Sequence, residues 1–380
     1  MSWKGRKFEV TVGKVAHGGH CVARHEGRVV FVRHALPGER VIASVTEDRS
    51  ESFCRADAVE VLTPSPDRVE PPCPVAVPGG CGGCDWQHAT WDAQRALKAT
   101  VVAEQLSRLA HVEMPVEVEP LPGGPLDWRT RVRMTVDDAG HPGFLAHRSH
   151  RVVPVADCPI AAPGTVDEVT TRTWTPGTSL TIAVDATAHT HVGDSEVAVE
   201  RAARREWRVS GFWQAHPDAA DVYAEVISSW SGLAPGESAW DLYSGVGLFA
   251  AVLAEQVGPS GSVMAVESYR PAAVESAENL SDLPQVRVFA GRVEAVLRAG
   301  EGPDPSVVVL DPPRRGAGKQ VVDAIVARGT SRVLYVACDP AALARDVATF
   351  HGHGFTLTRL RAFDAFPMTH HVECVALLER

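Results

Sequence analysis

The feature that most constrains the fold is an alternation of short apolar runs with helical segments after residue 207. Runs such as SVVVL (306–310) and VLYVA (333–337) are almost wholly apolar, which is typical of strands buried on both faces of a sheet. Each is followed by a segment with helical spacing of apolar residues, as in QVVDAIVARG (320–329). This rhythm predicts an α/β, Rossmann-like, doubly wound parallel sheet over residues 207–380.

Two further domains are predicted before this sheet. Residues 1–62 contain short β-rich runs separated by Gly, Pro and charged residues, which predict a small OB-like barrel. Residues 63–206 begin with a segment dense in Pro and Gly. They continue with helical spacing over 88–111 and end in alternating patterns that fit an antiparallel sheet, so a central α+β domain is expected.

The charge distribution is uneven. The net charge is −10, yet residues 1–40 hold eight Lys or Arg against three Glu, a local balance of +5. A local basic region is enough for phosphate contacts, so residues 1–62 are expected to contribute nucleic-acid affinity rather than chemistry. No apolar run is long enough for a bilayer and the N-terminal segment lacks a signal-peptide pattern. A cytoplasmic protein without membrane association or an obligate protein partner is expected, most simply a monomer.

Three of the eight cysteines, Cys73, Cys81 and Cys84, fall within twelve residues. Disulfides are rare in the cytoplasm, so this spacing indicates a metal or cluster site rather than scattered core thiols. Thiolates suit either zinc or an iron–sulfur cluster, and the chemistry of the ligands alone leaves both open.

A glycine-rich loop follows the first predicted strand of the doubly wound sheet, in AWDLYSGVGLFA. Gly245 and Gly247 allow a ligand to approach the backbone at a helix start. Glu267 closes the next strand, where an acid can bind ribose hydroxyls. This geometry serves NAD or S-adenosylmethionine, or a tight turn without ligand. Asp241, which precedes the loop, would meet an amino-acid end of the ligand and favours S-adenosylmethionine.

The ends of the later strands carry a carboxylate and a thiol. Asp311 stands in DPPRRG and Cys338 in ACDP, and the carboxyl ends of parallel strands meet at one edge of a sheet. Cys338 lies at a predicted helix start, which favours a thiolate. Methylation of uracil at C5 needs a thiolate that adds to C6 and a base that removes the C5 proton. Glu373 is the candidate base, with His370 and His371 next.

Taken together, these motifs resemble the RNA uracil-C5-methyltransferase family, which includes tRNA and ribosomal-RNA enzymes, over nearly the whole chain. Residues 13–41 resemble the TRAM domain, an RNA-binding β-barrel, and GFWQAHP resembles the Phe-x-Gln element of the family. DPPRRG, YVACDPAALARD and FPMTHHVE resemble its later motifs. The resemblance implies Cys338 as nucleophile and Glu373 as base. It implies S-adenosylmethionine as cofactor, with contacts from Gln214, Tyr243, Glu267 and Asp311.

Some family members carry a [4Fe–4S] centre, and the resemblance implies Cys73, Cys81, Cys84 and Cys158 as its ligands. The first gap is longer here, seven residues instead of five. Cys21, Cys54 and Cys374 are then expected to be structural thiols. Other departures from the family pattern are Asp339 for the usual Asn, Ala337 for Ser, Ser244 for Cys and Leu248 for a polar residue.

The sequence therefore predicts methylation of C5 of a uridine in ribosomal RNA or tRNA. Three alternatives stay open: an RNA-binding module without activity, a methyltransferase for a non-RNA substrate, and an NAD-linked oxidoreductase. A covalent RNA adduct at Cys338 and a comparison of NAD with S-adenosylmethionine binding would discriminate among them.

Overall fold

Four β-sheets organise the residues that the computed structural model describes, which are 2–48, 52–193 and 197–380. The largest has eight strands in the order β17-β16-β15-β18-β19-β21-β20-β7. Strands β15 to β19 are parallel, and β21 is antiparallel to both of its neighbours. The strands are β7 (Val118–Pro120), β15 (Ser238–Leu242), β16 (Ser262–Glu267), β17 (Val286–Ala290), β18 (Val307–Leu310), β19 (Arg332–Ala337), β20 (Thr356–Asp364) and β21 (Glu373–Glu379).

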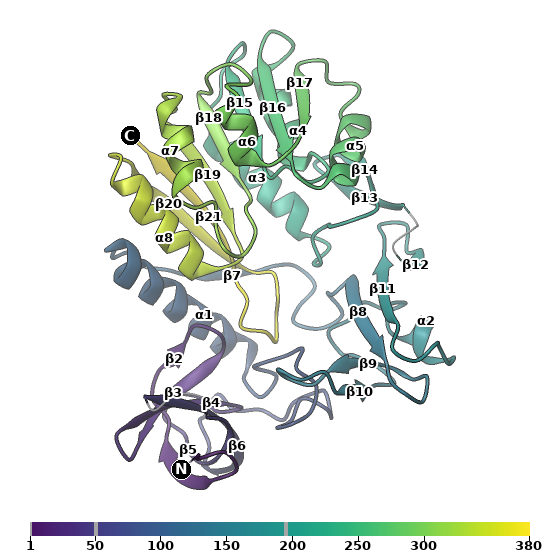
Figure 1. Cartoon of the computed structure of the whole chain (residues 1–380), viewed down its shortest axis with the longest axis vertical. Coiled ribbons are helices and arrows are strands. Elements are labelled where there is room, and N and C mark those ends of the chain that lie inside the picture. Colours follow the sequence, from purple (N-terminus) through teal and green to yellow (C-terminus); the bar gives the residue numbers. More distant parts are fainter. Residues whose placement is uncertain (1, 49–51, 194–196) are drawn as a thin grey trace.

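Helices cover both faces of this sheet (Figure 1). Successive strand residues face opposite sides: Val307 and Val309 pack into one core, and Val308 and Leu310 into the other. This explains why the strands are apolar at every position. One face packs against α3 (Ala219–Ser231), α4 (Leu248–Val257) and α5 (Arg270–Asn279). The other packs against α1 (Trp91–Gln105), the π-helix η1 (Leu106–Ala110), α6 (Val293–Arg298), α7 (Lys319–Ala327) and α8 (Pro340–His351).

The N-terminal strands form the expected small barrel. Its six-stranded sheet has the order β1-β5-β6-β4-β3-β2 and encloses a core of small and β-branched side chains, among them Val30, Val32 and Val41. The strands are β1 (Lys7–Thr11), β2 (Val15–Ala16), β3 (His20–His25), β4 (Arg28–Arg33), β5 (Arg40–Glu47) and β6 (Phe53–Thr63).

The central part contains the predicted antiparallel sheet, with the order β10-β9-β8-β11-β12, and the short helix α2 (Asp167–Thr170). Two segments expected in this sheet lie elsewhere. Strand β7 extends the large sheet because α1 and η1 pack beside α8 and bring it there. Strand β13 pairs with β14, whose Trp207 is buried in the α3–α4 core. The strands are β8 (Arg131–Val136), β9 (Pro142–Leu145), β10 (Val152–Pro154), β11 (Ser179–Val184), β12 (Thr190–Val192), β13 (Ala198–Ala202) and β14 (Arg205–Val209).

The fold class is therefore confirmed: a Rossmann-like domain preceded by a barrel and a central α+β part. Within the described ranges, none of the helices combines the length and apolar character that crossing a membrane requires.

Candidate active site

Four polar side chains lie at strand ends on one face of the large sheet. Asp241 is the next-to-last residue of β15 and lies on the α3–α4 side. Asp311 and Cys338 directly follow β18 and β19, Glu373 begins β21, and all three continue the alternation that faces this side. Ala337 pairs with Cys374 across the antiparallel strands β19 and β21. The next position on each strand therefore sets Cys338 opposite Glu373. The structure brings the expected thiol and the expected base together.

Burial and the neighbouring carboxylates raise the pKa values of the side chains at this edge. Burial, together with Glu373 and Asp311, raises the pKa of Cys338 to about 12, against the opposing effect of Arg314. Burial and Asp311 raise the pKa of Glu373 well above its ordinary value. Burial, aided by Glu267, raises the pKa of Asp311 to about 7. The expectation that the helix start makes Cys338 a thiolate is thus wrong for the ligand-free protein, because desolvation and the two carboxyls outweigh the helix dipole.

Tyr223 lies on α3 beneath these residues and was not predicted from the sequence. Its side chain is fully buried and its hydroxyl has no hydrogen-bond partner. Its ring lies 5.7 Å from that of Phe363, which pairs with Glu373 across β20 and β21. Glu373 is the largest charged influence on Tyr223 and raises its pKa further above the value set by burial. A single tyrosine in a predicted helix does not indicate that its side chain lies beneath an active site.

The glycine loop after β15 is open on one side and closed on the other. Gly245 has φ of +54° and a Cβ there would meet nothing within 4 Å. Gly247 has φ of +101°, and a Cβ there would lie 2.6 Å from Leu280 Cδ1. Glu267 Oε2 accepts a hydrogen bond from Gly245 N at 3.0 Å. Gly247 is therefore required by packing, whereas Gly245 leaves room for a ligand beside the Glu267 carboxylate.

Asp241 and Ser244 are buried at this loop without partners. Both carboxylate oxygens of Asp241 and the hydroxyl of Ser244 lack a hydrogen bond in the structure, although Asp241 is fully buried. Burial, with Asp311 and Glu267 nearby, raises the pKa of Asp241 to about 8, against the opposing effect of the Ala250 N–H. A buried polar atom without a partner is costly and calls for one, such as a bound ligand or a water molecule. Carboxylate and hydroxyl oxygens suit a ligand that carries a positively charged ammonium and a sulfonium group.

The raised pKa values predict that the ligand-free protein loses stability as the pH rises. Between pH 4 and 8 the folded state keeps a proton on Asp241 that the unfolded chain releases, so unfolding becomes more favourable as the pH increases. Asp241→Asn removes this difference in proton binding between the folded and the unfolded protein. Its melting temperature should fall less from pH 6 to pH 8 than that of the wild type, by about 3 °C or more. Exposed Asp138→Asn is the control. Equal pH slopes for all three proteins would contradict the assignment.

Two other expected cofactor residues lie near this loop. Gln214 is 9% exposed, and the preceding Trp213 packs in the same core as Val246 of the loop. Tyr243 has φ of +66° and its side chain packs on the α6–α8 face of the sheet. Arg314 was missed as a separate residue, although its motif was recognised. Its guanidinium lies 3.0 Å from His371 Nε2 and on the edge that carries Cys338 and Glu373.

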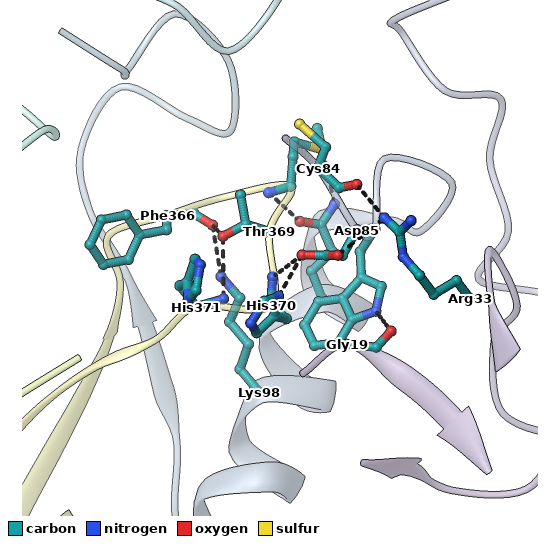
Figure 2. Close-up of polar contacts among 12 residues, drawn as sticks. Gly19, Arg33, Cys84, Asp85, Lys98, Phe366, Thr369, His370 and His371 are labelled. Atoms are coloured by element: carbon teal, nitrogen blue, oxygen red, sulfur yellow. Dashed lines mark hydrogen bonds and ion pairs between the residues drawn. The ribbon is translucent and has the colours of Figure 1, made fainter. Parts of the chain in front are cut away.

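The loop before Glu373 is held by the central part of the chain (Figure 2). Lys98 of α1 is fully buried, forms an ion pair with Asp364 and donates a hydrogen bond to Phe366 O at 3.0 Å. Trp91 Nε1 donates to Asp364 Oδ2 at 2.7 Å. Met368 N donates to Gln94 Oε1 at 2.7 Å, and Asp85 N and Trp86 N donate to Met368 O at 2.9 and 3.0 Å. Helix α1 therefore sets the position of the base loop.

Loss of this ion pair should be strongly destabilising. Lys98→Ala leaves the Asp364 carboxylate buried without its cation, which costs about 3–5 kcal/mol. Lys319, exposed on α7 in a pair with Asp323, is the matched control, and Lys319→Ala should change stability by about 0.5 kcal/mol at most. Urea denaturation of the two variants measures the difference. Similar midpoints for both would contradict this role of Lys98.

The four expected cluster ligands, Cys73, Cys81, Cys84 and Cys158, line one cavity together with Arg129 and Gln87. Within the described residues, no three or more His, Cys, Asp or Glu side chains form a group that could hold a metal ion. Cys84 and Cys158 share a small apolar core with Met368 and Phe366 of the base loop. The structure thus brings the cysteines to one cavity next to this loop, and the iron–sulfur centre stays a prediction.

Comparison with known proteins agrees with this architecture. A family model described as tRNA (Uracil-5-)-methyltransferase matches residues 274–380, and a TRAM domain model matches residues 2–59. An uncharacterized RNA methyltransferase of Streptomyces avermitilis is 46% identical over 99% of this chain and 98% of its own length. One of Streptomyces coelicolor is also 46% identical, over 100% of this chain and 94% of its own.

A solved structure has the same fold from end to end. The tRNA (uracil-54, C5)-methyltransferase of Pyrococcus abyssi, in complex with S-adenosyl-L-homocysteine, superposes with a TM-score of 0.74 over 98% of this chain and 100% of that chain, at 21% identity.

Fold, barrel and glycine loop together define an S-adenosylmethionine-dependent RNA methyltransferase. The chain belongs to the RNA uracil-C5-methyltransferase family. An NAD-linked oxidoreductase, one of the alternatives from the sequence, is thereby set aside.

Proposed function

We propose that the enzyme methylates C5 of a uridine in ribosomal RNA or tRNA through a covalent bond between Cys338 Sγ and C6 of the base. The observation that carries this proposal is the register of β19 and β21, which sets Cys338 opposite Glu373. Both face the side of the sheet on which the glycine loop and Asp241 lie. A thiol and a buried carboxyl at the mouth of a cofactor loop are the groups that this reaction needs.

The proposed roles follow from the chemistry of uracil. C5 of the free base is a weak nucleophile. When Cys338 Sγ gives its proton to solvent and bonds to C6, the electron pair of the C5–C6 double bond moves toward C5 and O4. Bound S-adenosylmethionine would supply an electrophilic methyl group to C5 and would leave as S-adenosylhomocysteine. Glu373, in its ionised form, then takes the proton from methylated C5, the double bond reforms, and Cys338 leaves C6 as a thiolate.

The proposed cofactor site lies at the glycine loop. Asp241 would bind the ammonium of the amino-acid moiety, since its buried oxygens lack partners. Glu267 would bind the ribose hydroxyls, because its carboxylate is fixed by the backbone of Gly245. A positive charge bound here would also lower the raised pKa values of the neighbouring acids. The full proposed set is Gln214, Asp241, Tyr243, Gly245, Gly247, Glu267 and Asp311.

The three parts of the chain are proposed to divide the work. Residues 1–62 would bind RNA, residues 63–206 would carry the cysteine site, and residues 207–380 would perform the chemistry. The second part also supplies α1 and β7 to the large sheet. A uridine must leave its stack to reach a thiol at this depth, so a loop should be a better substrate than a duplex.

We also propose that Cys73, Cys81, Cys84 and Cys158 hold one [4Fe–4S] cluster of structural role. The donors fit this group, because four thiols from two distant segments line one cavity. Because no group of three or more ligands among the described residues meets the geometry of a metal site, the proposal rests on the shared cavity and on the four thiols. Gln87 donates to Cys84 Sγ at 3.1 Å and Gly83 N to Cys81 Sγ at 3.4 Å, as expected around cluster thiolates.

Cluster content is open to a direct prediction. Protein purified without oxygen should contain about four irons and four sulfides per chain. Cys84→Ser should lose most of the iron and lower the melting temperature, because the cavity adjoins the base loop. Cys54→Ser, in the barrel core, should keep the iron. Stoichiometric zinc without iron in the wild type would refute the proposal.

Tritium release tests the proposed reaction. RNA labelled at C5 of its uridines loses tritium to water when C5 is methylated, so every methyl transfer should be accompanied by release of tritium. Mass spectrometry of tRNA and both large ribosomal RNAs from a deletion strain would then locate the uridine. Methyl transfer without tritium release would place the methyl group at another atom and reject the proposal.

A further inference from the structure

The turn between barrel strands β2 and β3 reaches the catalytic part of the molecule. His17 Nε2 lies 3.1 Å from Asp339 Oδ2. Asp339 directly follows Cys338, and its other oxygen, Oδ1, accepts a hydrogen bond from Ala342 N at 2.7 Å. Asp339 thereby caps helix α8. One carboxylate joins the barrel to the helix that begins beside the proposed nucleophile.

The end of the same turn lies against the base loop (Figure 2). Gly19 has φ of +80°, and a Cβ there would lie 2.9 Å from His370 Cβ and 3.2 Å from Asp85 Cβ. Trp86 Nε1 donates a hydrogen bond to Gly19 O at 3.1 Å. His370 Nδ1 lies 2.6 Å from Asp85 Oδ2, and Glu373 follows three residues later. The turn therefore contacts both the nucleophile side and the base side of the site.

Other barrel contacts support a fixed orientation. Arg33 of β4 donates to Cys84 O at 3.3 Å and lies 3.4 Å from Asp85 Oδ1. Lys14 pairs with Glu104 of α1. Of the eight basic residues in 1–40, these two and three more, Arg6, Arg28 and Arg40, form ion pairs within the protein. Five of the basic side chains expected to bind RNA are thus in ion pairs within the barrel or between the barrel and its neighbours.

The identity of residue 339 fits this contact. An asparagine could cap α8 through its single side-chain oxygen, and its amide nitrogen would then face His17. Aspartate offers a second oxygen, which takes the histidine and carries a charge. The departure from the usual family residue is therefore matched by a partner in the barrel.

We propose that the barrel turn positions the nucleophile, with His17 acting through Asp339 and Gly19 setting the distance to the base loop. His17 is a positioning residue. The barrel then contributes to the rate of covalent attack and not to RNA affinity alone, which extends the role expected from the sequence. The inference rests on the proposed covalent reaction at Cys338.

The test compares the rate of covalent attack on RNA with the affinity for RNA in the full-length enzyme. His17→Ala should slow single-turnover adduct formation at saturating RNA about fivefold, while the Kd for the same RNA changes less than about twofold. His17→Gln should restore most of the rate, because its amide can still donate to Asp339. Asp339→Asn should cost as much as His17→Ala, and the double variant no more than either single one.

A control histidine and two outcomes complete the test. His141 pairs with Asp137 in the turn between β8 and β9 and is exposed, and His141→Ala should leave both rate and Kd unchanged. If His17→Ala weakens RNA binding and leaves the saturated rate intact, His17 is an RNA contact and the inference is wrong. Additive losses in the double variant would also overturn it. If the wild type forms no adduct at Cys338, the proposed function itself fails.

Discussion

Cys338→Ala is expected to abolish methyl transfer to RNA, with a loss of about ten-thousandfold or more. Without the sulfur no bond to C6 forms, so C5 never becomes nucleophilic. The variant should still bind S-adenosylmethionine, since the glycine loop and Glu267 lie on other strands. It should also fold, because Cys338 is only half-buried at the strand end. Methyl transfer from a labelled cofactor, together with calorimetry of cofactor binding, separates the two effects.

Cys374 provides the matched control. It is buried on β21 and packs on the opposite face of the sheet from Cys338 and Glu373. Cys374→Ala should lower stability by about 1 kcal/mol and keep turnover within a few-fold of the wild type. Substantial activity in Cys338→Ala would place the nucleophile elsewhere, and loss of activity in both variants alike would point to folding rather than chemistry.

Glu373→Gln is expected to stop the reaction one step later, with a loss of turnover of about a thousandfold. The amide cannot take the C5 proton, so the methylated adduct has no route to release Cys338. Glu373 starts from a pKa well above its ordinary value, owing to burial and the nearby Asp311. The wild-type rate should therefore rise with pH as Glu373 loses its proton. In the variant the part of this rise that Glu373 causes should be missing, whereas the raised pKa of Cys338 still acts on the attack step.

Glu379 lies at the far end of the same strand and pairs with Arg332. Glu379→Gln therefore controls for removal of a carboxylate from β21, and it should turn over normally. If Glu373→Gln also turns over normally, His370 and His371 become the next candidates for the base. His371 is held neutral, since burial lowers its pKa to about 3.

Much of this site could be predicted from the sequence because its residues lie at strand ends. The apolar runs located β15, β18 and β19, and a parallel sheet places the residues after them at one edge. Glu373 was a candidate from its own segment, but its role came from the family resemblance, because β21 is antiparallel and its start, not its end, reaches that edge. Local pattern gives no means of placing such a strand.

Long-range contacts could not be predicted from the sequence. Lys98 and Asp364 are 266 residues apart, and nothing in the helical pattern of α1 marks a buried lysine. The strand β7 is three residues long and its place in the large sheet depends on where α1 packs. The raised pKa of Cys338 was also missed, since it follows from burial and two carboxyls on neighbouring strands.

The most direct measurement is the intact mass of Glu373→Gln after incubation with substrate RNA and a cofactor labelled in its methyl group. A protein–RNA species that survives denaturation, carries the labelled methyl, and maps to Cys338 after digestion of both polymers is the predicted result. The same species should be missing with Cys338→Ala. Methylated RNA released without any covalent complex, or an adduct on another residue, would contradict the account.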